Sequence, residues 1–114
     1  MHEAGIAMEV LRLAEETARA QGARRVTALR VLVGRWSGVE PETLRFALET
    51  LADGPALSGC RVDIEVEEPR FRCGGCGNVF PGESFLDLCP SCGDGGTELV
   101  AGDELVLREI EVEE

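Results

Sequence analysis

The sequence predicts a two-layer α+β fold in which two helices pack on a three-stranded sheet and a smaller cysteine-rich segment is inserted before the last strand. Two stretches carry apolar residues at helical spacing, and three show the alternation typical of strands. Residues 70–102 interrupt this pattern, because they are rich in glycine and hold four of the five cysteines. We therefore expect one domain made of residues 1–69 and 103–114, and a second made of residues 70–102.

The first predicted helix covers residues 3–21. Its inward positions recur every three or four residues and comprise Ile6, Ala7, Val10, Leu13, Ala14, Thr17 and Ala18. Gly22 follows, where helices commonly end in a left-handed residue. Residues 25–36 predict a strand with two largely apolar faces, in which Thr27, Leu29, Val31 and Val33 alternate with Ala28, Arg30 and Leu32. Such a strand is expected at the centre of a sheet or beneath a helix.

A second helix is predicted after Glu40, with Pro41 at its first position. Its apolar residues have helical spacing and are Leu44, Ala47, Leu48 and Leu51. The helix is expected to end at residues 53–55, where Asp, Gly and Pro follow one another. Residues 60–68 then predict a strand with one face in water. Its inward residues are Cys60, Val62, Ile64 and Val66, and its outward residues are Arg61, Asp63, Glu65 and Glu67.

The last predicted strand covers residues 103–113. Its inward residues are predicted to be Val106, Ile110 and Val112, and its outward residues Glu109, Glu111 and Glu113. Arg108 interrupts the inward face, and Leu105 and Leu107 fall on the outer one. We therefore expect a β-bulge in this strand, or a covered outer face.

The composition disfavours several classes of protein. A net charge of −11, from 22 acidic and 11 basic residues, disfavours binding to nucleic acid. No apolar run is long enough to cross a bilayer and no secretory leader is recognised, so we expect a cytoplasmic protein that does not contact membranes. In a reducing compartment, paired cysteines bind metal more often than they form disulfides.

Two Cys-x-x-Cys turns predict one structural zinc site. Cys73 and Cys76 form the first pair, Cys89 and Cys92 form the second, and a glycine follows each pair. Such a glycine permits the positive φ of the turn and lets backbone N–H groups point at sulfur. Four cysteines close a tetrahedral shell and leave no position for substrate, so the insert is expected to be a zinc-ribbon-like domain with an all-cysteine metal site. Two disulfides, a thioredoxin-like redox pair and an iron centre are less favoured alternatives.

Three phenylalanines, Phe71, Phe80 and Phe85, are expected to form the small core of the insert, and metal must stabilise the rest. Cys60 lies on the inward face of its strand. We therefore expect it to be a small buried apolar residue rather than a metal ligand.

His2 is the only histidine of the chain and directly follows Met1. The amine of Met1, the backbone amide of His2 and its imidazole can close fused chelate rings around one ion, with Glu3 near a fourth position. Nitrogen-rich square-planar sites of this kind suit Ni²⁺ or Cu²⁺ better than Zn²⁺. From these residues alone, a merely solvated histidine is the more common situation, and both interpretations stay open.

Three features in this order resemble a known family: Met1-His2-Glu3 before a helix, residues 37–46, and the paired Cys-x-x-Cys insert before a Glu-rich final strand. Residues 37–46 contain Ser-Gly-Val-Glu-Pro-Glu followed by Leu-Arg-Phe. Over essentially its whole length the chain is similar to the HypA/HybF family of hydrogenase maturation nickel chaperones. The resemblance implies delivery of Ni²⁺ to the large-subunit precursor of nickel-iron hydrogenase, with the GTPase HypB as partner. In some organisms related proteins also serve urease, so urease maturation proteins are further candidate partners.

The resemblance also implies nickel ligands. They map onto Met1 through its amine, His2 through its ring and backbone, and Glu3, with Glu40 as a further carboxylate. The alternative for Glu40 is a helix-capping role, because a carboxylate complements the positive end of a helix. The chain has Arg35 and Trp36 where family members often carry an acidic and then an aliphatic residue.

A second class of function is a zinc-ribbon module that binds another protein without delivering nickel. A metal analysis separates the two, because the module predicts zinc alone and the carrier predicts zinc plus labile nickel. An enzyme is disfavoured, because one terminal histidine and four closed-shell thiolates supply no base, nucleophile and orienting group.

Overall fold

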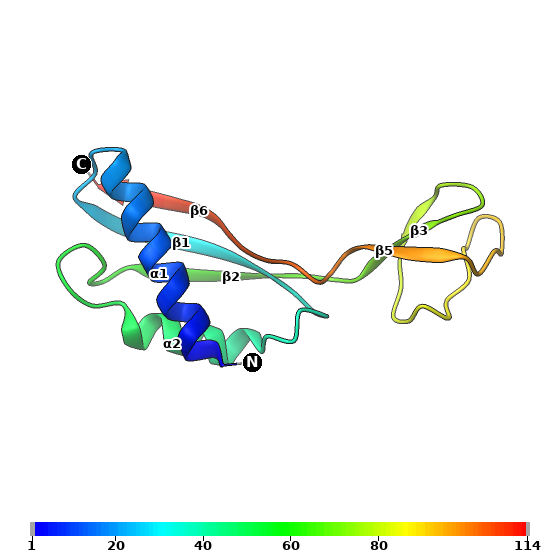
Figure 1. Ribbon diagram of the computed structural model, residues 1–114, viewed down its shortest axis with the longest axis horizontal. Helices are drawn as coiled ribbons and strands as arrows, with labels where there is room; N and C mark the ends of the chain where they lie inside the picture. Colours follow the sequence, from blue (N-terminus) through cyan, green and yellow to red (C-terminus); the bar gives the residue numbers. More distant parts are fainter. Residues whose placement is uncertain (1, 114) are drawn as a thin grey trace.

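The computed structural model describes residues 2–113 and shows two sheets at opposite ends of an elongated molecule (Figure 1). The larger part, which we call the main body, contains α1 (Glu3–Ala20), β1 (Arg25–Gly34), α2 (Pro41–Leu51), β2 (Arg61–Glu67) and β6 (Leu105–Glu113). The smaller part, which we call the cysteine module, contains β3 (Arg70–Cys73), β4 (Val79–Pro81) and β5 (Thr97–Ala101). Residues 68–69 connect β2 to β3, and residues 102–104 connect β5 to β6.

The main body is the predicted two-layer α+β fold. Strand β1 lies at the centre of the sheet, parallel to β2 and antiparallel to β6. The inward side chains of β1 pair with those of both neighbours: Leu29 lies opposite Val62 and Ile110, and Val31 lies opposite Ile64 and Leu107. The two helices bury their apolar faces against this sheet and against each other, which forms one continuous core. The predicted fold class is confirmed.

The first helix ends where a glycine permits it. Gly22 has φ of +74°, and the backbone N–H groups of Gly22 and Ala23 donate to the carbonyls of Arg19 and Ala18. This is a Schellman motif, in which a left-handed residue closes the last turn. The buried face of α1 consists of Ala7, Val10, Leu11, Ala14 and Ala18. Leu13, which was predicted to face inward, is 44% exposed and lines an open groove between α1 and β6.

The expected bulge lies in β6. Arg30 pairs with Glu109 and the next residue of β1, Val31, pairs with Leu107, so Arg108 is an extra residue that shifts the register. Residues on the N-terminal side of the bulge therefore change faces. Leu105 and Leu107 pack on the core, whereas Val106 is 46% exposed. The predicted inward position of Val106 and the outward positions of the two leucines are wrong for this reason.

The cysteine module also contains regular structure that the sequence did not predict. Its three strands form an antiparallel sheet in the order β4-β3-β5. Phe71, Phe80, Cys73 and Cys89 are buried between the sheet and the loops. Phe85, the third predicted core phenylalanine, packs edge-on against Phe71 but stays 54% exposed.

The overall shape is extended. The molecule measures 55 × 27 × 16 Å and has a radius of gyration of 17.6 Å, whereas a compact domain of this length has about 13 Å. The two parts therefore share little surface along the long axis. Neither helix within residues 2–113 is both long and apolar enough to cross a membrane.

Candidate metal sites

Two turns of nearly identical geometry carry the four cysteines. In the first, the N–H of Gly77 donates to the carbonyl of Cys73, and the N–H of Cys73 donates to the carbonyl of Asn78. The second turn repeats both bonds between Cys89 and residues 93–94. Gly77 and Gly93 both have positive φ, of +78° and +79°, which the glycine after each pair was expected to provide. Each turn therefore holds its two thiols on one side.

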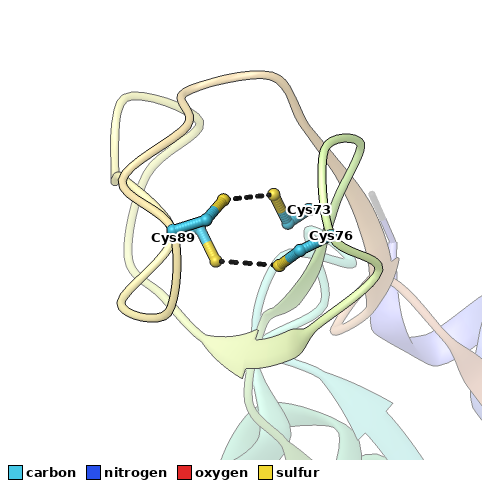
Figure 2. A group of neighbouring side chains, drawn as sticks. Cys73, Cys76 and Cys89 are labelled. Carbon is cyan, nitrogen blue, oxygen red and sulfur yellow. Dashed lines mark hydrogen bonds between the residues drawn. The ribbon is translucent and has the colours of Figure 1, made fainter.

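The structure brings these four thiols together (Figure 2). All four Sγ atoms lie within 4.8 Å of one another, with Cys73 and Cys92 3.5 Å apart and Cys76 and Cys89 3.6 Å apart. A tetrahedral Zn²⁺ with Zn–S bonds of about 2.3 Å separates its sulfurs by about 3.8 Å, so the cluster has the size of such a shell. A disulfide would require a separation of about 2.0 Å, and all five cysteines are free thiols.

Backbone N–H groups point at the sulfur atoms. The N–H of Gly75 donates to Cys73 Sγ over 3.3 Å. The other thiols receive N–H groups from Asn78, Ser91, Cys92 and Asp94. These dipoles favour the thiolate form that a metal requires.

The thiols affect one another's ionisation. Desolvation opposes the ionisation of Cys89, but the N–H groups of Cys92 and Ser91, together with the neighbouring thiols, outweigh it and lower the pKa of this thiol to about 6. The N–H of Asp94 favours ionised Cys92, but the neighbouring cysteines oppose it and raise the pKa of that thiol to about 12. Adjacent thiolates repel one another, so the four groups need a cation to be ionised together.

A second layer of contacts joins the two turns. The N–H of Gly74 donates to the carbonyl of Gly96 over 2.8 Å. A Cβ atom at Gly75 would lie 2.6 Å from Oδ2 of Asp94, whose Oδ1 accepts from the N–H of Gly96. The glycines between Cys73 and Cys76 therefore allow the second turn to approach closely.

A second group of predicted residues lies at the start of α1. The carboxylate of Glu3 accepts a hydrogen bond from the backbone N–H of Glu40 over 3.3 Å, although 37 residues separate them. His2 is exposed, and its carbonyl accepts the N–H groups of Gly5 and Ile6 as the first bonds of the helix. Met1, the remaining predicted ligand, lies outside the described residues. Within residues 2–113, three or more metal-binding side chains gather only at the four cysteines.

Glu40 has the capping role that was the alternative to metal binding. Its two carboxylate oxygens accept the N–H groups of Thr43 and Glu42 at the start of α2, over 3.0 and 3.2 Å. These bonds lower the pKa of Glu40, and the hydroxyl of Thr43 adds a third. The carboxylate is exposed and ionised, and the backbone N–H of the same residue keeps it beside Glu3.

The comparisons with known proteins identify one family. The family model described as "Hydrogenase/urease nickel incorporation, metallochaperone, hypA" matches residues 1–112. The chain belongs to the HypA family. This family consists of nickel metallochaperones for hydrogenase and urease maturation rather than of catalytic enzymes, in agreement with the predicted resemblance.

Individual relatives match along their full length. The hydrogenase maturation factor HypA of Geobacter sulfurreducens is 39% identical over 113 residues, which are 99% of this chain and 100% of the relative. That of Chlorobaculum tepidum is 38% identical over the same shares. The solution structure of the nickel metallochaperone HypA from Helicobacter pylori has a TM-score of 0.70 and 23% identity, and covers 99% of this chain and 98% of that one. At this identity, it supports the fold alone.

One residue with a structural role at the centre of the HypA chain was not predicted. Strand β1 ends at Gly34 rather than at Trp36, because the N–H of Ser37 turns back to the carbonyl of Gly34. Trp36 follows this turn and packs, partly buried, against the core of the cysteine module. The sequence marked this position only as a departure from the aliphatic residue that family members often carry there, and that departure did not indicate a contact with the cysteine module.

Proposed function

We propose that this HypA chain binds Ni²⁺ at its amino terminus and delivers it to the large-subunit precursor of nickel-iron hydrogenase. The family match over residues 1–112 is the observation that carries this proposal. The relatives named as hydrogenase maturation factors support hydrogenase as the acceptor system. The GTPase HypB is the proposed partner in delivery, and urease maturation proteins are a second destination. We place this activity in the cytoplasm.

We further propose that the four cysteines hold a structural Zn²⁺. The chemistry of the donor set supports zinc, because four thiolates at tetrahedral spacing suit this ion and leave no open position. Its role is then to stabilise the cysteine module, which has only four buried residues in its core.

The proposed nickel site combines the amine of Met1, the amide and imidazole nitrogens of His2, and the carboxylate of Glu3. Amine and amide must lose protons, so binding is expected to strengthen as the pH rises past the amine pKa of about 8. Glu40 is proposed as a second carboxylate of this site, because its backbone N–H donates to the carboxylate of Glu3 and so keeps the two residues together. The positive ends of α1 and α2 oppose a bound cation, which moderates the affinity and suits a carrier.

A nickel titration tests this site. Untagged protein should bind labile nickel beside one zinc, whereas His2→Ala and a form extended before Met1 should bind nickel much more weakly and keep their zinc. Equal nickel binding by all three proteins excludes the amino-terminal site. Transfer is then measured by incubating nickel-loaded protein with purified large-subunit precursor and HypB and following nickel in the precursor.

The alternative function is a zinc-ribbon module that binds a protein and carries no nickel. One observation favours it: Leu86 and Leu88 of the cysteine module are 88% and 62% exposed. This function predicts zinc alone in the purified protein. Specific loss of nickel in His2→Ala would rule it out as the sole activity.

A further inference from the structure

Trp36 connects the main body to the cysteine module. Its ring packs edge-on against Phe71, with centroids 5.6 Å apart, and lies tilted against Phe85, with centroids 5.4 Å apart. Phe71 is fully buried at the centre of the module, and Phe85 stands on the loop before Cys89. A side chain from one part therefore completes the aromatic core of the other.

Backbone bonds hold the same segment to both connecting strands. The N–H of Trp36 donates to the carbonyl of Gly102 over 2.7 Å, and the N–H of Arg35 donates to the carbonyl of Glu67 over 2.9 Å. The guanidinium of Arg35 also forms a two-pronged pair with the Glu68 carboxylate. Residues 35–36 thus bind to both chain segments that connect the main body to the cysteine module. These bonds restrain the orientation of the module relative to the main body.

A short ordered path leads from Trp36 to the proposed nickel site. Val39 is buried in the main body, and its N–H donates to the hydroxyl of Ser37. The next residue, Glu40, caps α2 and donates its own N–H to the carboxylate of Glu3. Only the short segment of residues 37–40 therefore separates the aromatic contact of Trp36 from the N–H group that binds Glu3.

We propose that Trp36 is a positioning residue: by docking in the cysteine module, it fixes residues 37–40 and so holds Glu3 and Glu40 where they can bind nickel. This inference rests on the proposed nickel site. The protein then has two states, with the cysteine module docked on Trp36 or undocked from it. Nickel favours the docked state, because the carboxylates of Glu3 and Glu40 are then already in place. Binding energies are reciprocal, so nickel should in turn tighten the docking of Trp36.

The test is a double-mutant cycle at the aromatic contact. Trp36→Ala and Phe85→Ala each remove one side of it, and each is expected to weaken nickel binding by about fivefold or more. The double variant is expected to be weakened by no more than Trp36→Ala alone, because that change already removes the contact with Phe85. Trp36→Phe should restore the affinity to within about twofold, since a ring remains in the site.

The protein supplies its own reporter. Trp36 is the only tryptophan and there is no tyrosine, so the emission wavelength reports on the surroundings of this side chain alone. Nickel should shift the emission of the wild-type protein to shorter wavelength, and should do so less in Phe85→Ala. Leu86→Ala serves as the matched control, because it removes an apolar side chain that is 88% exposed on the same loop.

Zinc content and circular dichroism show that each variant is folded, and Phe85→Ala keeps the test valid if Trp36→Ala does not fold, because Phe85 is half exposed. Unchanged nickel affinity in folded Phe85→Ala overturns the positioning role while leaving the nickel site intact. Wild-type protein that binds nickel no better than His2→Ala overturns the nickel site, and this inference with it.

Discussion

Glu40 shows how one side chain serves both local structure and the proposed site. Its carboxylate accepts three hydrogen bonds at the start of α2, and these bonds favour the ionised form. Its backbone N–H reaches Glu3 instead. The start of α2 therefore fixes the position of Glu40. The carboxylate that caps this helix is the same group that would bind a cation in the proposed site.

Replacing Glu40 with glutamine tests the capping charge. Because the pKa of Glu40 is lower in the folded than in the unfolded chain, its contribution to stability is full above the unfolded value of about 4.3. That contribution is lost as the pH falls through the folded value. Glu40→Gln should thus lower the midpoint of urea unfolding at pH 7, and the difference from wild type should vanish in acid. A difference that is independent of pH would contradict this account.

Gly5 offers a stabilising substitution on the same helix. It is exposed within α1, and nothing lies within 4 Å of a Cβ atom built on it. Gly5→Ala is expected to raise the free energy of unfolding by about 0.5–1 kcal/mol, because alanine restricts the unfolded chain and favours helix. Gly22→Ala is the matched control and should destabilise by a similar amount, because Gly22 has φ of +74°. Thermal unfolding of both variants and of the wild type measures these two changes in stability.

At the scale of elements, the junction depends on glycines that allow backbones to touch. A Cβ atom on Gly34 would lie 2.3 Å from the backbone carbonyl of Gly102, and one on Gly102 would lie 2.6 Å from Cα of Pro69. Three chain segments thus meet where β1 ends and the two connecting strands pass. No side chain can yield here, since the contacts are with backbone.

Gly34→Ala should therefore disturb the junction strongly. We expect a loss of roughly 3 kcal/mol in the free energy of unfolding, at the upper end of the range for overpacked buried sites. The emission of Trp36 should move to longer wavelength, because the turn that carries it must shift. Chemical unfolding followed by fluorescence measures both effects. A stability close to that of wild type would show that the connecting strands move apart easily.

The elements of the main body were predictable because their patterns are local. Helical spacing, a glycine after α1 and alternation in β2 each follow from a few neighbouring residues. The inward and outward faces of β6 could not be predicted in this way. The position of the bulge at Arg108 is set by pairing with β1 rather than by the residues of β6 alone. Strands β3 and β5 could not be predicted either. They are short, and each forms by pairing with the other, although both cysteine turns lie between them in the sequence.

The candidate sites differ in the same way. The four cysteines were found from spacing alone, since each Cys-x-x-Cys turn carries its own geometry. The contact between Glu3 and Glu40 joins two helix starts, and only the family resemblance linked these residues in advance. The packing of Trp36 against the module core could not be predicted from its departure from the family pattern, because it depends on how the two parts are joined.

At the scale of the whole molecule, the two parts have separate cores. The core of the main body contains no residue of the cysteine module, and Trp36 is its main apolar link to the module. The core cluster of the module has four buried residues, so we expect the module to need the proposed metal in order to fold. The two parts should therefore lose structure under different conditions.

Metal removal should unfold the cysteine module and spare the main body. With a strong chelator, the emission of Trp36 is expected to move to longer wavelength, while the helical circular dichroism of α1 and α2 persists. Proteases should then cleave within residues 70–102 and leave a protected main body, which also tests the proposed boundaries at residues 69 and 103. Zinc should restore both signals, and magnesium at equal concentration should restore neither, because thiolates bind it poorly. If the helices melt together with the module, the two parts fold as one unit and the separation of their cores has no energetic consequence.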